Sequence, residues 1–116
     1  MSGGSSVWTV RLTDTAAKDF KGIVRWSRDR FGERQARVYG ATLALALRDL
    51  SSGPDQLGVK VRSDIAKGLL TLHVARHGRK GSHFVMFRVA DEPGRVLEVL
   101  RLLHETMDFP RHLPPS

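Results

Sequence analysis

The chain contains no cysteine, and none of its apolar runs is long. The first absence excludes disulfide bonds and thiol chemistry, and it fits a reducing cytoplasm. The second excludes a membrane-spanning helix, which needs about 20 consecutive apolar residues. Residues 1–6 are small and polar and lack the basic and apolar regions of a signal peptide. We therefore expect a flexible N-terminal tail on a cytoplasmic protein with no membrane partner.

Acidic residues are scarce as well, because 12 Asp and Glu stand against 19 Lys and Arg. The excess is concentrated between residues 58 and 88, where seven basic residues face one acid, Asp64, so that 7 − 1 = +6 in 31 residues. The seven are Lys60, Arg62, Lys67, Arg76, Arg79, Lys80 and Arg88. Such clustering indicates either attraction to an acidic partner, such as nucleic acid, or a solvated face that keeps a small protein in solution.

Two helices are predicted in the first half of the chain, after a short strand at 7–12. Thr13 suits a helix N-cap, and apolar residues follow it at spacings of three and four up to Phe31. Gly32 suits a C-cap, and the same periodicity resumes from Ala36 to Leu50. Since only one or two residues join the helices, they must form a helical hairpin.

The second half of the chain alternates with a period of two, which predicts strands. These cover about 69–75, 83–90 and 96–103, with a further short strand possible near 59–61. The strand at 83–90 is apolar on both faces and is expected in the centre of the sheet. Short turns imply an antiparallel arrangement. The fold class is therefore α+β, with an N-terminal strand and a helical hairpin packed on a C-terminal antiparallel sheet, in one domain over 7–113 and with a C-terminal tail at 114–116.

The element order and several short motifs resemble the ParE/RelE toxin superfamily, and the ParE branch in particular. The motifs are Leu12-Thr13, Phe31-Gly32, the strand His83 to Arg88, and the ending Arg101-Leu102-Leu103-His104 followed by Met107-Asp108 and His112-Leu113. The resemblance covers about residues 10–113. One departure is Phe87, which stands where members of this family often carry tyrosine, and the basic loop from Arg76 to Ser82 is longer than usual.

The resemblance implies the toxin half of a type II toxin–antitoxin system, which serves plasmid stabilisation or growth inhibition. It implies DNA gyrase as the target, inhibited by binding rather than by catalysis. It also implies a ParD-like antitoxin in a hetero-oligomer, with operator DNA bound only through the antitoxin. Our candidates for target binding are basic side chains of the sheet and its loops, namely Arg76, Arg79, Lys80, Arg88, Arg101 and His104.

The antitoxin is expected on apolar side chains of the hairpin that fall outside the main core stripe. Trp26, Val38 and Leu45 are the candidates. An exposed tryptophan would be an effective anchor for a partner protein, although packing under the sheet is the plainer alternative.

The main rival function is cleavage of messenger RNA on the ribosome, as RelE-like enzymes perform it. That reaction needs a general acid and base as well as cations. The single tyrosine, Tyr39, falls on the apolar face of the second helix and is expected in the core. His104 and Asp108 are the remaining catalytic candidates, and the alternative for His104 is a hydrogen bond to backbone at the strand end. A third possibility is a basic nucleic-acid-binding domain that uses the stretch from Lys60 to Arg88.

No metal or cofactor site is expected. His73 and His77 are four residues apart, which on a strand separates them by over about 10 Å, too far for one ion.

Overall fold

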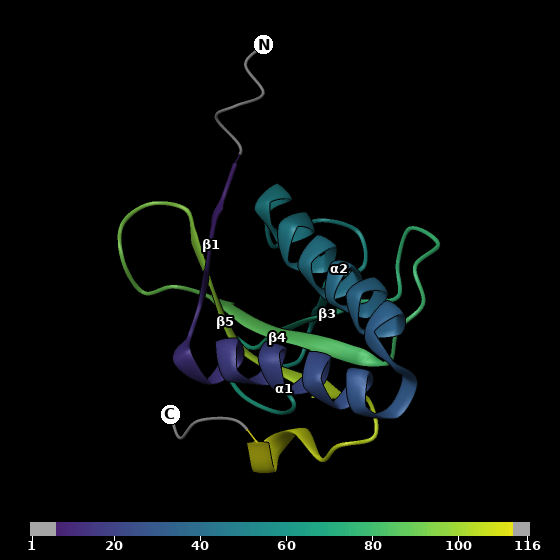
Figure 1. Cartoon of the computed structure of the whole chain (residues 1–116). Helices are drawn as coiled ribbons and strands as arrows, with labels where there is room; N and C mark the ends of the chain where they lie inside the picture. Colours follow the sequence, from purple (N-terminus) through teal and green to yellow (C-terminus); the bar gives the residue numbers. More distant parts are fainter. Residues whose placement is uncertain (1–6, 113–116) are drawn as a thin grey trace.

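The computed structural model of the chain describes residues 7–112, so the two expected tails at 1–6 and 114–116, and Leu113, lie outside the described residues. A strand, β1 (Thr9–Leu12), is followed by the helical hairpin α1 (Asp14–Phe31) and α2 (Glu33–Asp49). The strands β2 (Lys60–Val61), β3 (Leu70–His73), β4 (His83–Val89) and β5 (Val96–His104) complete the sheet. Short 3-10 helices occupy Leu50–Ser52 and Phe109–His112. The α+β architecture expected from the sequence is confirmed (Figure 1).

The hairpin begins and ends where local chemistry dictates. The Thr13 side chain accepts a hydrogen bond from the Ala16 amide at 3.1 Å, and Asp14 stands in the first turn, where the helix dipole favours an anion. Gly32 alone joins the helices with φ at 95°, a conformation that costs a glycine little. The expected hairpin is therefore correct. Phe31, expected in the core stripe, is 61% exposed, and its ring packs on Trp26 instead.

The sheet has the order β1-β5-β4-β3-β2, with β4 in the centre as its apolar faces predicted. The pairs from β2 to β5 are antiparallel, but β1 runs parallel to β5, with Thr9 opposite Val96. The first and last strands of the domain are thus neighbours, which makes the sheet mixed. Between β4 and β5 the register shifts, because Met86 pairs with Arg101 while Phe87 pairs with Val99.

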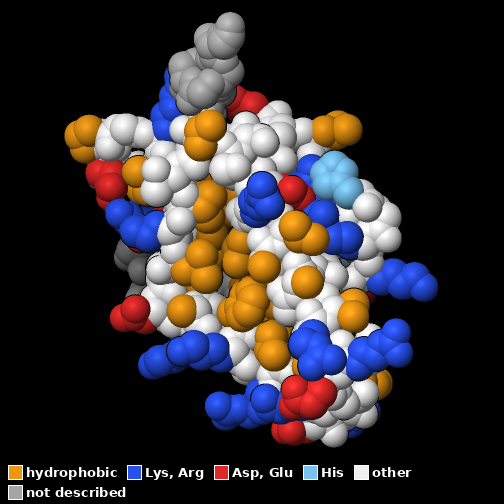
Figure 2. Space-filling view, turned by 45° about the horizontal axis from the view of Figure 1, so that its top comes forward, with side chains coloured by type: hydrophobic (Ala, Val, Ile, Leu, Met, Phe, Trp, Pro, Cys, Tyr) orange, Lys and Arg blue, Asp and Glu red, His pale blue; other side chains and the backbone are white. Residues whose placement is uncertain are grey.

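Apolar residues form two clusters, and alternation along β4 divides them. Val85 and Phe87 belong to the larger cluster, which joins the sheet to Leu43, Ala46 and other helical residues. Met86, between them, belongs to a smaller cluster with Leu69, Leu103 and Phe109. Phe87, which stands where the family often has tyrosine, is fully buried and is therefore a core residue in this chain. In Figure 2, apolar side chains form a run down the middle of one face of the molecule.

Candidate groove at the helical hairpin

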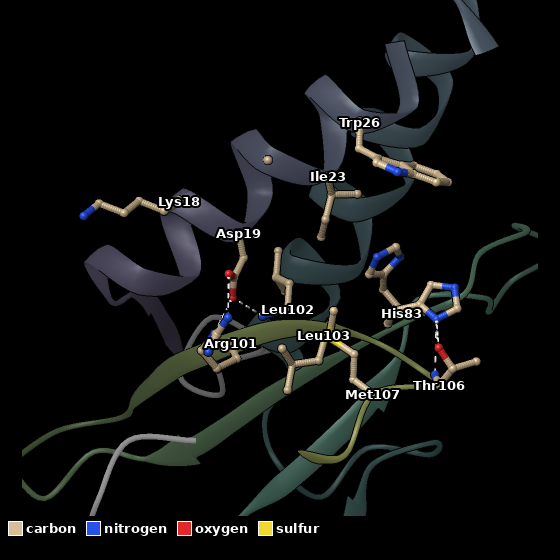
Figure 3. A pocket seen from close by; sticks show the side chains of 12 residues that line it. Lys18, Asp19, Ile23, Trp26, His83, Arg101, Leu102, Leu103, Thr106 and Met107 are labelled. Carbon is tan, nitrogen blue, oxygen red and sulfur yellow. Dashed lines mark hydrogen bonds and ion pairs between the residues drawn. The ribbon is translucent and has the colours of Figure 1, made fainter. Parts of the chain in front are cut away.

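Two cavities of about 470 and 400 Å³ meet along α1 and share Trp26, His83 and His104. We call them together the hairpin groove. The first lies between α1 and the end of β5, and Figure 3 shows Ile23 and Trp26 facing this strand. The second lies between the two helices and the start of β4, where Val38 and Lys80 contribute to its wall. The groove therefore joins residues that are up to 89 positions apart in the sequence, from Lys18 to Met107.

Trp26 is the prominent apolar group of the groove, with 54% of its surface exposed. Its ring contacts the edge of Phe31 at a centroid distance of 5.8 Å, and the Arg30 guanidinium lies 5.4 Å from its centroid. Val38, another antitoxin candidate, is 55% exposed and lines the same groove. Leu45 is exposed two helical turns further along α2 but lines neither cavity. The structure thus brings together two of the three antitoxin candidates.

The polar floor of the groove is a pair of side chains, Tyr39 and His83. The Tyr39 ring packs against the larger core cluster as expected, but its hydroxyl lies 2.6 Å from His83 Nδ1 and accepts a hydrogen bond from the Ser82 amide at 3.0 Å. Treating Tyr39 as a core residue alone was therefore incomplete. Burial lowers the pKa of His83 to about 4, and the neighbouring His104 contributes to the lowering. The His83 ring is consequently neutral at pH 7. Sequence periodicity gave no signal for this pair, since 44 residues separate the two.

His104 stands beside His83, with ring centroids 5.2 Å apart. Its Nδ1 accepts a hydrogen bond from the Thr106 amide at 3.2 Å and lies 2.7 Å from the Thr106 hydroxyl. This confirms the expectation that the ring bonds backbone at the strand end. Asp108, the other catalytic candidate, lines neither cavity.

Arg101 lines the groove but is fully engaged within the fold. Its guanidinium donates to both carboxylate oxygens of Asp19, at 2.7 and 2.9 Å, and to the carbonyl of His112 at 2.6 Å. Asp19 also accepts a hydrogen bond from the Leu102 amide at 3.0 Å. Figure 3 shows this connection between α1 and β5. Arg101 therefore fixes one wall of the groove.

The remaining target candidates are not in the groove, with one exception. The side chains of Arg76 and Arg79, target candidates from the basic loop, turn back to Asp49 at the end of α2. The nearest nitrogens lie 3.6 and 2.5 Å from Asp49 Oδ2. Arg88 pairs with Glu98 across the sheet at 2.8 Å. Lys80 alone of this group lines the groove, and no ion pair involves it among residues 7–112.

The two histidines rejected as metal ligands have separate partners. His73 Nε2 lies 2.7 Å from Glu105, while His77 lies 3.9 Å from Asp49. Among residues 7–112, no group of three or more ligating side chains is placed to hold a metal ion. Neither helix of this part of the chain is long and apolar enough to cross a bilayer.

Comparison with known proteins agrees with this geometry. Residues 10–109 match the family model described as the ParE toxin of the type II toxin–antitoxin system parDE. A solved structure of a chromosomal ParDE system from P. aeruginosa has a TM-score of 0.68 and 20% identity, covering 86% of this chain and 98% of that one. The RelBE2 toxin–antitoxin complex from Mycobacterium tuberculosis has a TM-score of 0.54 and 26% identity, with coverages of 84% and 98%. A YoeB/ParE toxin from Agrobacterium tumefaciens has a TM-score of 0.53 and 19% identity, covering 83% of this chain and 96% of that one. No curated protein sequence matches the chain.

Proposed function

Because this chain belongs to the ParE toxin family of type II toxin–antitoxin systems, we propose that it stops growth by binding DNA gyrase. We further propose that a ParD-like antitoxin neutralises it by filling the hairpin groove. One observation carries the proposal: Trp26 and Val38, candidates for the antitoxin, line the same groove as Lys80 and His104, candidates for the target. An antitoxin seated there would cover the toxic surface directly.

The groove suits a partner that folds as it binds. Its exposed aromatic and aliphatic side chains offer apolar area to a disordered segment, and such a segment gains its structure from the contact. The net charge of +7 would speed the capture of an acidic tail. The antitoxin, not the toxin, would read operator DNA, and the system would act in the cytoplasm, where gyrase and the operator are found.

Action by binding also accords with the state of the polar groups. The Arg101 guanidinium is engaged by Asp19, so it is not free to stabilise a developing charge, and Asp108 lies outside the groove. Arg76 and Arg79 are similarly engaged with Asp49. Cleavage of RNA needs cations that can contact the developing charge, and these arginines are occupied within the fold.

Two assays test the proposal. The purified chain should inhibit supercoiling by gyrase, and Lys80→Glu should weaken the inhibition. Co-expression with the small protein encoded beside its gene should give a stable complex, and Trp26→Ala should reduce its affinity by about 30-fold or more, as truncation of an interface anchor does. Leu57→Ala is the matched control, because Leu57 is 93% exposed outside the groove. If an excess of the purified chain did not inhibit supercoiling, gyrase would not be the target, and only the family assignment would stand.

RNA cleavage is the second candidate, and one observation favours it. The Tyr39 hydroxyl and His83 Nδ1, 2.6 Å apart, lie in the groove beside Lys80, so an acid–base pair and a cation are close together. A pKa of about 4 makes His83 a weak base at pH 7, which argues for the gyrase proposal. Mapping of message ends after induction separates the two. New cuts that disappear in Tyr39→Phe would support the nuclease.

A further inference from the structure

The free positive charge of the molecule does not lie where the sequence concentrates it. Of the seven basic residues between 58 and 88, the four arginines are all in ion pairs, with Asp64, Asp49 and Glu98 as partners. Residues 18–37 of the hairpin hold seven Lys and Arg against three acids, so that 7 − 3 = +4 in 20 residues. One of these acids, Asp19, is turned to Arg101. The hairpin is therefore the more strongly cationic surface.

Four of these cations form a row along α1. Lys18, Lys21, Arg25 and Arg28 follow one another at spacings of three, four and three, which places them on one helical face over about 15 Å. All four are exposed. Of these four, only Arg28 has an ion pair with another residue of the described part of the chain, a long one of 3.6 Å to Glu33. Figure 2 shows Lys and Arg side chains collected along the lower edge of the face on which the apolar run lies.

The outer surface of α1 is open where the row is densest. Gly22 lies next to Lys18 and Arg25 on this helix, and a Cβ added there would meet nothing within 4 Å. A glycine in the middle of a helix costs about 1 kcal/mol relative to alanine, and here no packing contact accounts for it. Such a position permits close approach of another molecule. Asp14 and Asp29 are the acids that the spacing places beside the row.

We propose that this row binds the sugar–phosphate backbone of duplex DNA. Phosphates of a duplex form a regular, rigid line of charge, and a straight helical row of cations matches it without reading bases. The row itself contains no aromatic side chain on which an unpaired base could stack, since Trp26 turns into the hairpin groove. The choice of duplex DNA rests on the proposed function, because a toxin bound to gyrase lies beside the DNA that gyrase holds.

Fluorescence anisotropy with a labelled 20-base-pair duplex tests the inference on the purified full chain. The triple variant Lys18→Gln, Lys21→Gln, Arg25→Gln should bind at least tenfold more weakly. Its slope of log affinity against log salt should be shallower by about 2.7, since each lost phosphate contact removes about 0.9. Asp29→Asn should bind more tightly than the wild type, because it removes a negative charge from the same surface.

A second triple variant provides the matched control. Lys60→Gln, Lys67→Gln and Arg111→Gln remove the same charge from exposed positions elsewhere and should change affinity by less than about threefold. Equal losses in both triple variants would overturn the inference, since attraction would then depend on net charge alone. Tighter binding of poly-glutamate, or of single-stranded RNA of equal length, would also overturn it. If the chain inhibited gyrase but did not bind the duplex, this inference would be wrong and the proposed function would stand. If it bound the duplex but did not inhibit gyrase, only the proposed target would be wrong.

Discussion

His83 combines a buried position with a titratable ring, and the stability of the protein should depend on it. The pKa of about 4 in the folded protein lies below the ordinary 6.5, so the unfolded chain binds the proton more tightly. The stability contributed by neutral His83 is complete above pH 6.5 and is lost as the pH falls toward 4, by about 3 kcal/mol in all. Urea unfolding between pH 7 and 4 measures this loss.

The variant His83→Gln isolates the contribution. Its free energy of unfolding should fall less steeply over this pH range than that of the wild type. Parallel slopes in wild type and His83→Gln would show that other groups cause the pH dependence.

Gly22 provides a second prediction at a single residue. The substitution Gly22→Ala should raise the free energy of unfolding by about 0.5–1 kcal/mol, because the new methyl group meets nothing and the helix gains propensity. Gly81→Ala should do the reverse, since its Cβ would lie 2.4 Å from the Val74 side chain. Thermal denaturation of both variants checks the pair, and a loss of stability in Gly22→Ala would contradict it.

At the scale of elements, Asp49 connects the end of α2 to the segment between β3 and β4. It faces Arg76 and Arg79, whose side chains are 16% and 17% exposed, with His77 nearby. Arg76 also donates to the carbonyl of Leu57 at 3.3 Å. A carboxylate so enclosed cannot lose its partners without being left partly desolvated, so these pairs are structural.

Replacing both arginines should therefore destabilise the fold. Arg76→Ala with Arg79→Ala should lower the free energy of unfolding by about 1–3 kcal/mol, between the values for exposed and buried pairs. Lys80→Ala, in the same loop but without an ion pair, should change it by less than about 0.5 kcal/mol. Chemical denaturation of the two variants makes the comparison. An unchanged stability in the double variant would return both arginines to the candidate target surface.

The helices and strands of the fold could be predicted from the sequence, but the contacts between them could not. Periodicity, Thr13 and Gly32 located the hairpin, and alternation located β3, β4 and β5, because these signals act within a few residues. The ion pairs of Asp49 with Arg79 and of Arg101 with Asp19 join residues 30 and 82 positions apart. No local pattern encodes such pairs, so the sequence could not show which of the clustered arginines are engaged by acids. The sequence offered Trp26 as a candidate anchor, whereas the groove around it depends on tertiary packing.

For the whole molecule, the parallel pairing of β1 with β5 should be decisive for stability. Val10 and Leu12 pack their side chains against the main core cluster, while Thr9 and Arg11 on the same strand are exposed. Val10→Ser with Leu12→Ser should lower the free energy of unfolding by about 2–5 kcal/mol, through lost apolar burial. Thr9→Ser with Arg11→Ser should cost about 1 kcal/mol or less, since Arg11 pairs with Glu92 at the surface. Similar losses in both variants would show that β1 contributes by backbone pairing alone.

The pairing of Thr9 with Val96 also sets an order of events during synthesis. The two residues are 87 positions apart, and at about 5–20 residues per second a ribosome needs on the order of 4–17 s to make the second after the first. Until then β1 has no strand partner, and the central β4 lacks one of its two neighbouring strands. A nascent chain therefore cannot complete its sheet before β5 (Val96–His104) has been made, so the fold depends on the last strand of the sheet to be synthesised.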